Sequence, residues 1–234
     1  MKHRAFYPTW IILLIALWCT APDPSAAADL NPTRFVMPNG LTVLVLEQHS
    51  LPIVQIHAVI KAGSAQDQPE KAGLANLTAS LLDEGTANRS AKQIAEQIEF
   101  VGGLLAARAS HDFTTATARV LKKDTELGFE LLSDILLHPS FPDSELERVK
   151  SQLLGEILSE KDDPGQVGAK AFDQLVFEGH PYRWPINGTD ETLPKIKRAD
   201  VQQFFTHEFV PNQTILVIVG DVTVEQARTL VTKR

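Results

Sequence analysis

The stretch GLANLTASLLDEGT, residues 73–86, has the pattern of a short amphipathic helix with a glycine at each end. Its leucines recur at the spacing that places side chains on one helical face. These residues are Leu74, Leu77 and Leu81. A neighbouring face carries Asn76, Ala79 and Ser80, whose i, i+3, i+4 spacing brings three side chains together. We therefore predict a helix with one face in a core and a second face of small, uncharged residues.

Strand and helix patterns share the rest of the chain. Apolar alternation or short buried runs predict strands at residues 34–37, 41–46, 52–62, 104–121 (two strands around Ser110-His111-Asp112) and 214–220. Helical spacing predicts helices at residues 90–101, 123–137, 142–161, 167–177 and from 223 towards the C-terminus. The pair Asn39-Gly40 favours a tight hairpin turn. Hairpins together with helix pairs favour an α+β fold over a strictly alternating parallel sheet.

Composition excludes several classes of protein. The chain has 234 residues, of which 44% are hydrophobic and 22% charged, as in a folded globular protein. Its net charge is −7, and no run of more than two Lys or Arg residues occurs, which argues against a nucleic-acid partner. The single cysteine, Cys19, lies in the N-terminal segment, so the rest of the chain has neither a disulfide nor a thiol nucleophile.

The N-terminal segment has the anatomy of a secretory signal peptide. Basic residues at positions 2–4 precede an apolar run at residues 10–18, and small residues lead to Ala28. We predict a signal peptide at residues 1–28, a single domain at residues 29–234, and no membrane span after cleavage. The apolar run is short for a membrane anchor, which is the alternative interpretation. An exported chain without disulfides fits the bacterial periplasm best.

The face formed by Asn76, Ala79 and Ser80 has the spacing of a zinc motif without its side chains. In the His-x-x-Glu-His arrangement of inverted zincins, two histidines bind zinc and the glutamate activates the bound water. Asn76 and Ser80 stand at the histidine positions here, and Ala79 stands at the glutamate position. Asparagine and serine are poor zinc ligands, and alanine offers no donor.

The surrounding sequence resembles the insulinase/pitrilysin family of metallopeptidases, which includes the mitochondrial processing peptidase subunits. The resemblance runs from about Arg34 to the C-terminus and rests on landmarks in a fixed order. These are Gly63-Ser64, Gly73-Leu74-Ala75, Gly85-Thr86, Asp163-Pro164, His180-Pro181-Tyr182, Gly188-Thr189, Pro211-Asn212 and Val219-Gly220-Asp221-Val222. Each landmark alone is weak, whereas their order and spacing are specific.

The resemblance implies a mixed, mostly antiparallel β-sheet with helices packed mainly on one face. It also implies that Glu156, on a long helix and separated from Ser80 by 75 residues, stands at the position of the third zinc ligand. The resemblance implies that chains of this kind usually carry at least two such domains, which enclose a chamber. The present sequence corresponds to the first, normally metal-bearing domain, and is either a natural single domain or a piece of a two-domain chain.

Three functional hypotheses follow from the resemblance. The first is an exported, catalytically inactive homologue that supports an active insulinase-family partner and binds neither metal nor cofactor. The second is a stand-alone module that binds extended peptides by strand addition at a sheet edge. The third is an active zinc metalloendopeptidase with non-standard ligands. A hydrolase triad of Ser80 with His111 and Asp112 is rejected because no nucleophile-elbow sequence surrounds Ser80.

Overall fold

The structure is a computed structural model that describes residues 31–233. The predicted signal peptide, residues 1–28, lies outside the described residues. Residues Pro32–Arg234 form one compact unit. No helix among the described residues is long and apolar enough to cross a membrane.

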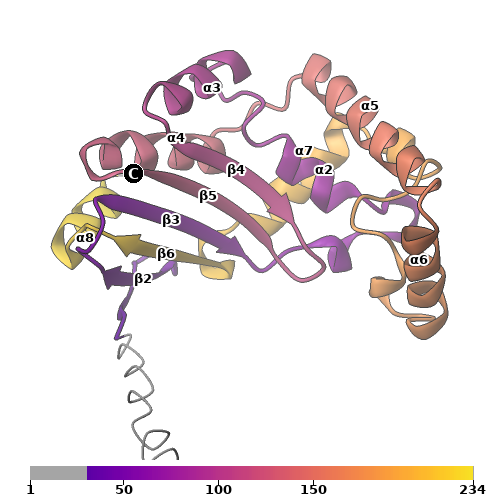
Figure 1. Ribbon diagram of the computed structural model, residues 1–234, viewed down its shortest axis with the longest axis horizontal. Helices are drawn as coiled ribbons and strands as arrows, with labels where there is room; N and C mark the ends of the chain where they lie inside the picture. The colour runs from indigo at the N-terminus through magenta and orange to yellow at the C-terminus, as the bar shows by residue number, and fades with distance from the viewer. Residues whose placement is uncertain (1–30, 234) are drawn as a thin grey trace, which may run out of the picture. The chain divides into compact units, whose positions relative to one another are not determined.

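One six-stranded sheet organises this unit (Figure 1). Its strands are β1 (Thr33–Val36), β2 (Thr42–Glu47), β3 (Ile53–Ile60), β4 (Leu104–Ala109), β5 (Thr114–Leu121) and β6 (Thr214–Gly220). The order across the sheet is β1-β2-β6-β3-β5-β4. Only β2 and β6 run parallel, and every other neighbouring pair is antiparallel. The prediction of a mixed, mostly antiparallel sheet is therefore confirmed.

Seven α-helices lie within the described residues. They are α2 (Leu74–Ser80), α3 (Ala91–Phe100), α4 (Thr125–Leu137), α5 (Asp143–Glu160), α6 (Pro164–Val176), α7 (Arg198–Glu208) and α8 (Val224–Thr232). Burial alternates along β3 and β5, because one face of each strand packs against helices and the other stays partly exposed. The buried residues of these strands join leucines of α2 and apolar residues of α4 and α5 in one core.

Two predicted details differ in the structure. Met37 and Leu41 are hydrogen-bonded to each other beyond the ends of β1 and β2, so the hairpin turns through the three residues between them. Gly40 takes the positive φ of 90° that this turn requires. The helix predicted over residues 73–86 ends at Ser80, and turns bonded from i to i+3 follow it. Leu81 and Leu82, which lie in these turns, are both fully buried.

Candidate functional site

The N-terminus of α2 is fixed by a carboxylate from the preceding loop. Asp67 accepts hydrogen bonds from the backbone N–H groups of Gly73 (2.9 Å) and Ala75 (3.0 Å). It satisfies donors that a helix N-terminus leaves without intrahelical partners. Burial raises the pKa of Asp67 to about 7, against the opposing effect of these backbone hydrogen bonds. The sequence analysis missed Asp67 because a cap normally lies beside its helix, whereas this one is six residues from Gly73.

A second segment closes over the same end of α2. A Cβ atom added to Gly188 would lie 2.3 Å from the Ala72 carbonyl oxygen, and one added to Gly73 would lie 2.9 Å from the Asn187 carbonyl oxygen. The Thr192 hydroxyl donates to the Ala72 carbonyl at 2.8 Å. The landmark Gly188-Thr189 therefore marks a turn that approaches the helix backbone too closely for a side chain.

The three predicted site positions on α2 face a largely closed environment. The Asn76 side chain, 9% exposed, donates from Nδ2 to Oδ1 of Asn187 at 3.1 Å. Ala79 is fully buried, and Ser80 is partly buried. The sequence analysis did not identify Asn187 as a site residue, because the landmark there was recognised from Gly188-Thr189, which follow it. The structure thus pairs Asn76 with another amide.

Glu156 lies on α5, which packs against α2. Its side chain is exposed and accepts a hydrogen bond from Gln152 one turn earlier, at 3.3 Å between Nε2 and Oε1. Within residues 31–233, no cluster of three or more His, Cys, Asp or Glu side chains could hold a metal ion. Glu156 is therefore the single carboxylate among the four predicted positions, and an amide, a methyl group and a hydroxyl occupy the other three.

Residues from two landmarks and from the hairpin of β4 and β5 form one wall beside α2. The Ser64 hydroxyl bonds with Nδ1 of His111 at 3.0 Å, and the His111 ring stacks on Tyr182 with 4.6 Å between ring centroids. The Tyr182 hydroxyl donates to Asp112 at 2.6 Å. His111 and Asp112 are thus engaged with residues other than Ser80, which agrees with the rejection of the triad. The wall joins the loop before α2, the hairpin of β4 and β5, and the segment after α6.

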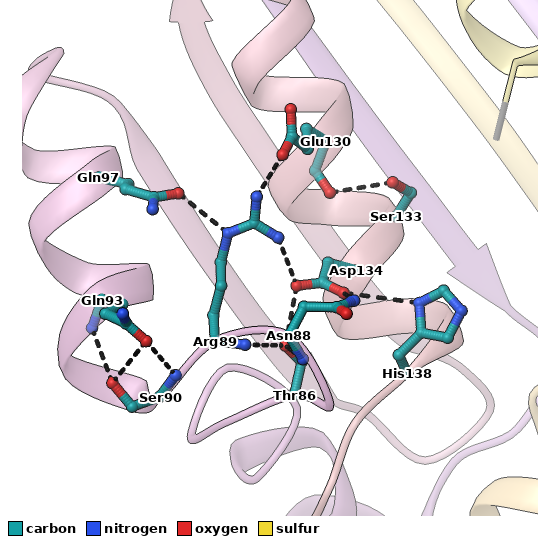
Figure 2. Close-up of polar contacts among 10 residues, drawn as sticks. All are labelled: Thr86, Asn88, Arg89, Ser90, Gln93, Gln97, Glu130, Ser133, Asp134 and His138. Carbon is teal, nitrogen blue, oxygen red and sulfur yellow. Dashed lines mark hydrogen bonds and ion pairs between the residues drawn. The ribbon is translucent and has the colours of Figure 1, made fainter.

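A polar cluster holds the segment after α2 against α4 (Figure 2). Asp134, 5% exposed, accepts hydrogen bonds from the Thr86 hydroxyl (2.8 Å), the Asn88 amide (2.6 Å) and the Arg89 guanidinium (2.7 Å). Burial alone raises the pKa of the Asp134 carboxyl, but these hydrogen bonds outweigh burial and leave the pKa below its ordinary value. The landmark Gly85-Thr86 therefore anchors the segment that follows α2 to the core helix α4.

The fold and this set of landmarks define a domain of the insulinase class of metallopeptidases. Residues 42–190 match the family described as Insulinase (Peptidase family M16), and the chain belongs to that family. The resemblance seen in the sequence is thereby confirmed.

Individual relatives differ in the activity that their names state. The chain is 25% identical over 190 residues to an uncharacterized zinc protease, YmxG, of Bacillus subtilis, covering 81% of this chain and 46% of that protein. It is 30% identical over 184 residues to the non-peptidase homolog YmxG of Helicobacter pylori, covering 79% of this chain and 43% of that protein. The chain therefore spans about half the length of the curated relatives it matches.

A solved structure with the same fold is also named as inactive. The peptidase M16 inactive domain from Pseudomonas fluorescens matches with a TM-score of 0.83 and 27% identity, over 87% of this chain and 50% of that one. The family thus includes both proteins named as zinc proteases and proteins named as inactive, and the present chain is compatible with the inactive group.

Proposed function

We propose that this chain is a catalytically silent, exported insulinase-family subunit that supports an active, zinc-bearing partner. The observation that carries the proposal is the preserved setting of α2 around a face that holds Asn76, Ala79 and Ser80. An amide and a hydroxyl bind zinc poorly, and without the metal no acidified water forms. Alanine at the remaining position supplies no general base. The inactive and non-peptidase relatives support the same interpretation.

The assignment of the vacated positions is testable by restoring ligands. Asn76→His combined with Ser80→His would give two imidazoles on one face of α2, and Glu156 would complete three protein ligands. We expect the double variant to bind one zinc ion per chain, measured by elemental analysis after dialysis. The same variant carrying Glu156→Gln is the matched control and should lose the metal. A folded double variant that binds no zinc, or binds it independently of Glu156, contradicts the assignment.

The partner role is tested by mixing purified chains. We expect the chain alone to cleave no peptide, and expect it to form a stoichiometric complex with an insulinase-family chain of the same source that contains His-x-x-Glu-His. The peptidase activity of that partner should rise when the complex forms. No complex and no change in activity would refute the partner role.

Export is checked separately, by sequencing the N-terminus of protein recovered outside the cytoplasm, where cleavage after Ala28 is expected.

A stand-alone peptide-binding function is the second candidate, and one observation favours it. Strand β4 is the edge of the sheet and contacts α2, so an extended peptide added to β4 would lie beside the vacated face. Calorimetry with unstructured peptides tests this function, and saturable heat in the absence of any partner chain would support it.

The third hypothesis, an active enzyme with other ligands, requires stoichiometric zinc in the unaltered protein and loss of that zinc in Glu156→Ala.

A further inference from the structure

One face of the sheet takes no part in the hydrophobic core of residues 31–233. We call it the open face, and it consists of the even-numbered residues of β1, β2 and β4 and the odd-numbered residues of β3, β5 and β6. The residues between them point to the other face, where they pack with the helices. No residue of the open face is buried, and none packs against the core. Its side chains are therefore accessible to another molecule.

The open face is basic although the chain is acidic. Its charged side chains are Arg34 on β1, Arg108 on β4 and Arg119 on β5, and no residue of this face, all of which the structure describes, is acidic. The whole chain has 29 acidic and 22 basic residues. Burial and, after it, the charge of Arg108 lower the pKa of His57 at the middle of the face. The positive charge of this face thus comes from the arginines.

These arginines differ from the others in the described part of the chain. Of the eight arginines within residues 31–233, three pair with carboxylates and two lie over aromatic rings. These five are Arg89, Arg148, Arg198, Arg183 and Arg228. The remaining three are those of the open face, and none of them makes a hydrogen bond, ion pair or ring contact within these residues. All the guanidinium groups that lack such a partner therefore lie on one face, where each can receive a carboxylate from another molecule.

Aliphatic side chains fill the middle of the open face. This apolar block consists of Leu44, Leu46, Ile215, Val217, Val219 and Val59. Its strands β2, β6 and β3 are neighbours, so the block is roughly 10 Å wide. Arg34 lies on one side of the block and Arg119 on the other, and the four strand spacings from β1 to β5 separate them by roughly 20 Å. The open face is thus an apolar surface with cations on both sides.

An anionic lipid surface fits the open face poorly. Proteins that lie on membranes place Trp or Tyr at the interface, and the open face has no aromatic residue among its described positions apart from the imidazole of His57. Neighbouring strands rotate by roughly 20°. Five such steps turn β4 by roughly 100° from β1, so a flat bilayer cannot contact both edges of the face. A polypeptide segment can follow this twist.

We propose that the open face binds a segment of a partner protein in which aliphatic residues lie between carboxylates. The aliphatic side chains pack on the apolar block, and the carboxylates pair with Arg34 on one side and with Arg108 and Arg119 on the other. In an extended segment, carboxylates about six residues apart span the distance of roughly 20 Å. This inference goes beyond the proposed function, because it assigns a surface and its chemistry independently of catalysis. It also differs from strand addition at β4, which uses the backbone of one edge strand.

Fluorescence anisotropy with labelled synthetic peptides tests the chemistry of the partner. The probe has about six leucines and valines between two pairs of glutamates, and its matched control has lysines in place of the glutamates. We expect the purified chain to bind the acidic peptide, more weakly as salt is added, and not to bind the basic one. Serines in place of the leucines and valines should weaken binding. No binding, equal binding of the acidic and basic peptides, or indifference to the serine change overturns the proposal.

Variants of the chain test the surface. Arg34→Glu and Arg119→Glu should keep the fold, because both side chains are exposed, and each should raise the dissociation constant of the acidic peptide at least about fivefold. Lys92→Glu is the matched control, since it makes the same change of charge at a side chain that is 82% exposed on α3, and it should leave the constant unchanged. Equal effects of the three variants overturn the proposal, as does an unaltered constant in Arg34→Glu, which strand addition at β4 predicts. Tighter binding to anionic vesicles or to a single-stranded oligonucleotide than to the acidic peptide overturns it as well.

Discussion

Replacing Gly188 with alanine is expected to destabilise the protein more than the same change at Gly179. Both glycines have nearly the same left-handed backbone, with φ of 75° at Gly188 and 78° at Gly179. They differ in their surroundings. A Cβ atom at Gly188 would lie 2.3 Å from the Ala72 carbonyl oxygen at the start of α2, whereas at Gly179 no atom lies within 4 Å. Gly179→Ala is thus a control for the backbone effect alone.

The expected magnitudes follow from these two terms. A left-handed conformation costs a residue with a Cβ atom roughly 1–2 kcal/mol. Reduced freedom of the unfolded chain offsets about 0.4–1 kcal/mol of that cost. Gly179→Ala should therefore lower the free energy of unfolding by about 1 kcal/mol. Gly188→Ala adds an overpacking cost of roughly 1–3 kcal/mol, because two backbone segments must separate.

Urea denaturation of both variants and the unaltered chain gives the comparison, and amide hydrogen exchange along α2 locates the effect. Gly188→Ala should speed exchange in α2, because the turn at Asn187-Gly188 no longer closes over its N-terminus. Equal destabilisation by the two variants, with unchanged exchange in α2, would falsify the idea that this turn fixes the helix.

Three further outcomes are expected. The folded state retains the Asp67 proton up to about pH 7, whereas the unfolded chain releases it near pH 3.8. The stability contribution of that proton is thus complete below pH 3.8 and is lost as the pH rises towards 7; Asp67→Asn should remove this decline from the pH dependence of the free energy of unfolding. Asp134→Ala should lower the free energy of unfolding by about 3 kcal/mol in urea denaturation, because it leaves Thr86 and Arg89 without their buried acceptor. Glu156→Ala should change thermal stability little, since the side chain is exposed; a large loss would reveal a structural role for this carboxylate.

Local patterns in the sequence predicted the local structure well. The leucine spacing around Leu77 and the helical spacing over residues 90–101 depend on neighbours within one or two turns, and the structure contains both helices. The α+β class followed from the order of such elements. The position of β6 between β2 and β3 was not predicted, because it depends on pairing between segments about 170 residues apart.

Contacts between distant segments limited the prediction of the site in the same way. The positions on α2 could be named from their spacing alone, and Glu156 from the landmarks that follow it. The hydrogen bond from Asn76 to Asn187 joins residues 111 positions apart, and no local periodicity encodes it. The exposure of the apolar residues of α6 was equally hidden, because helical spacing shows that a helix is amphipathic but does not show which side meets the domain.

Three contacts hold α2 in place, and they involve other residues than Ala79 and Ser80. Asp67 binds the backbone at the start of the helix, Gly188 lies against that backbone, and Thr86 anchors the exit. None of these contacts involves the side chain of Ala79 or Ser80. These contacts of α2 are therefore independent of the side chains at positions 79 and 80, and the Asn76–Asn187 hydrogen bond adds one more contact between the helix and the segment that closes over its N-terminus. In this chain the landmarks Gly85-Thr86 and Gly188-Thr189 position α2, so their presence indicates the fold and does not by itself indicate catalysis.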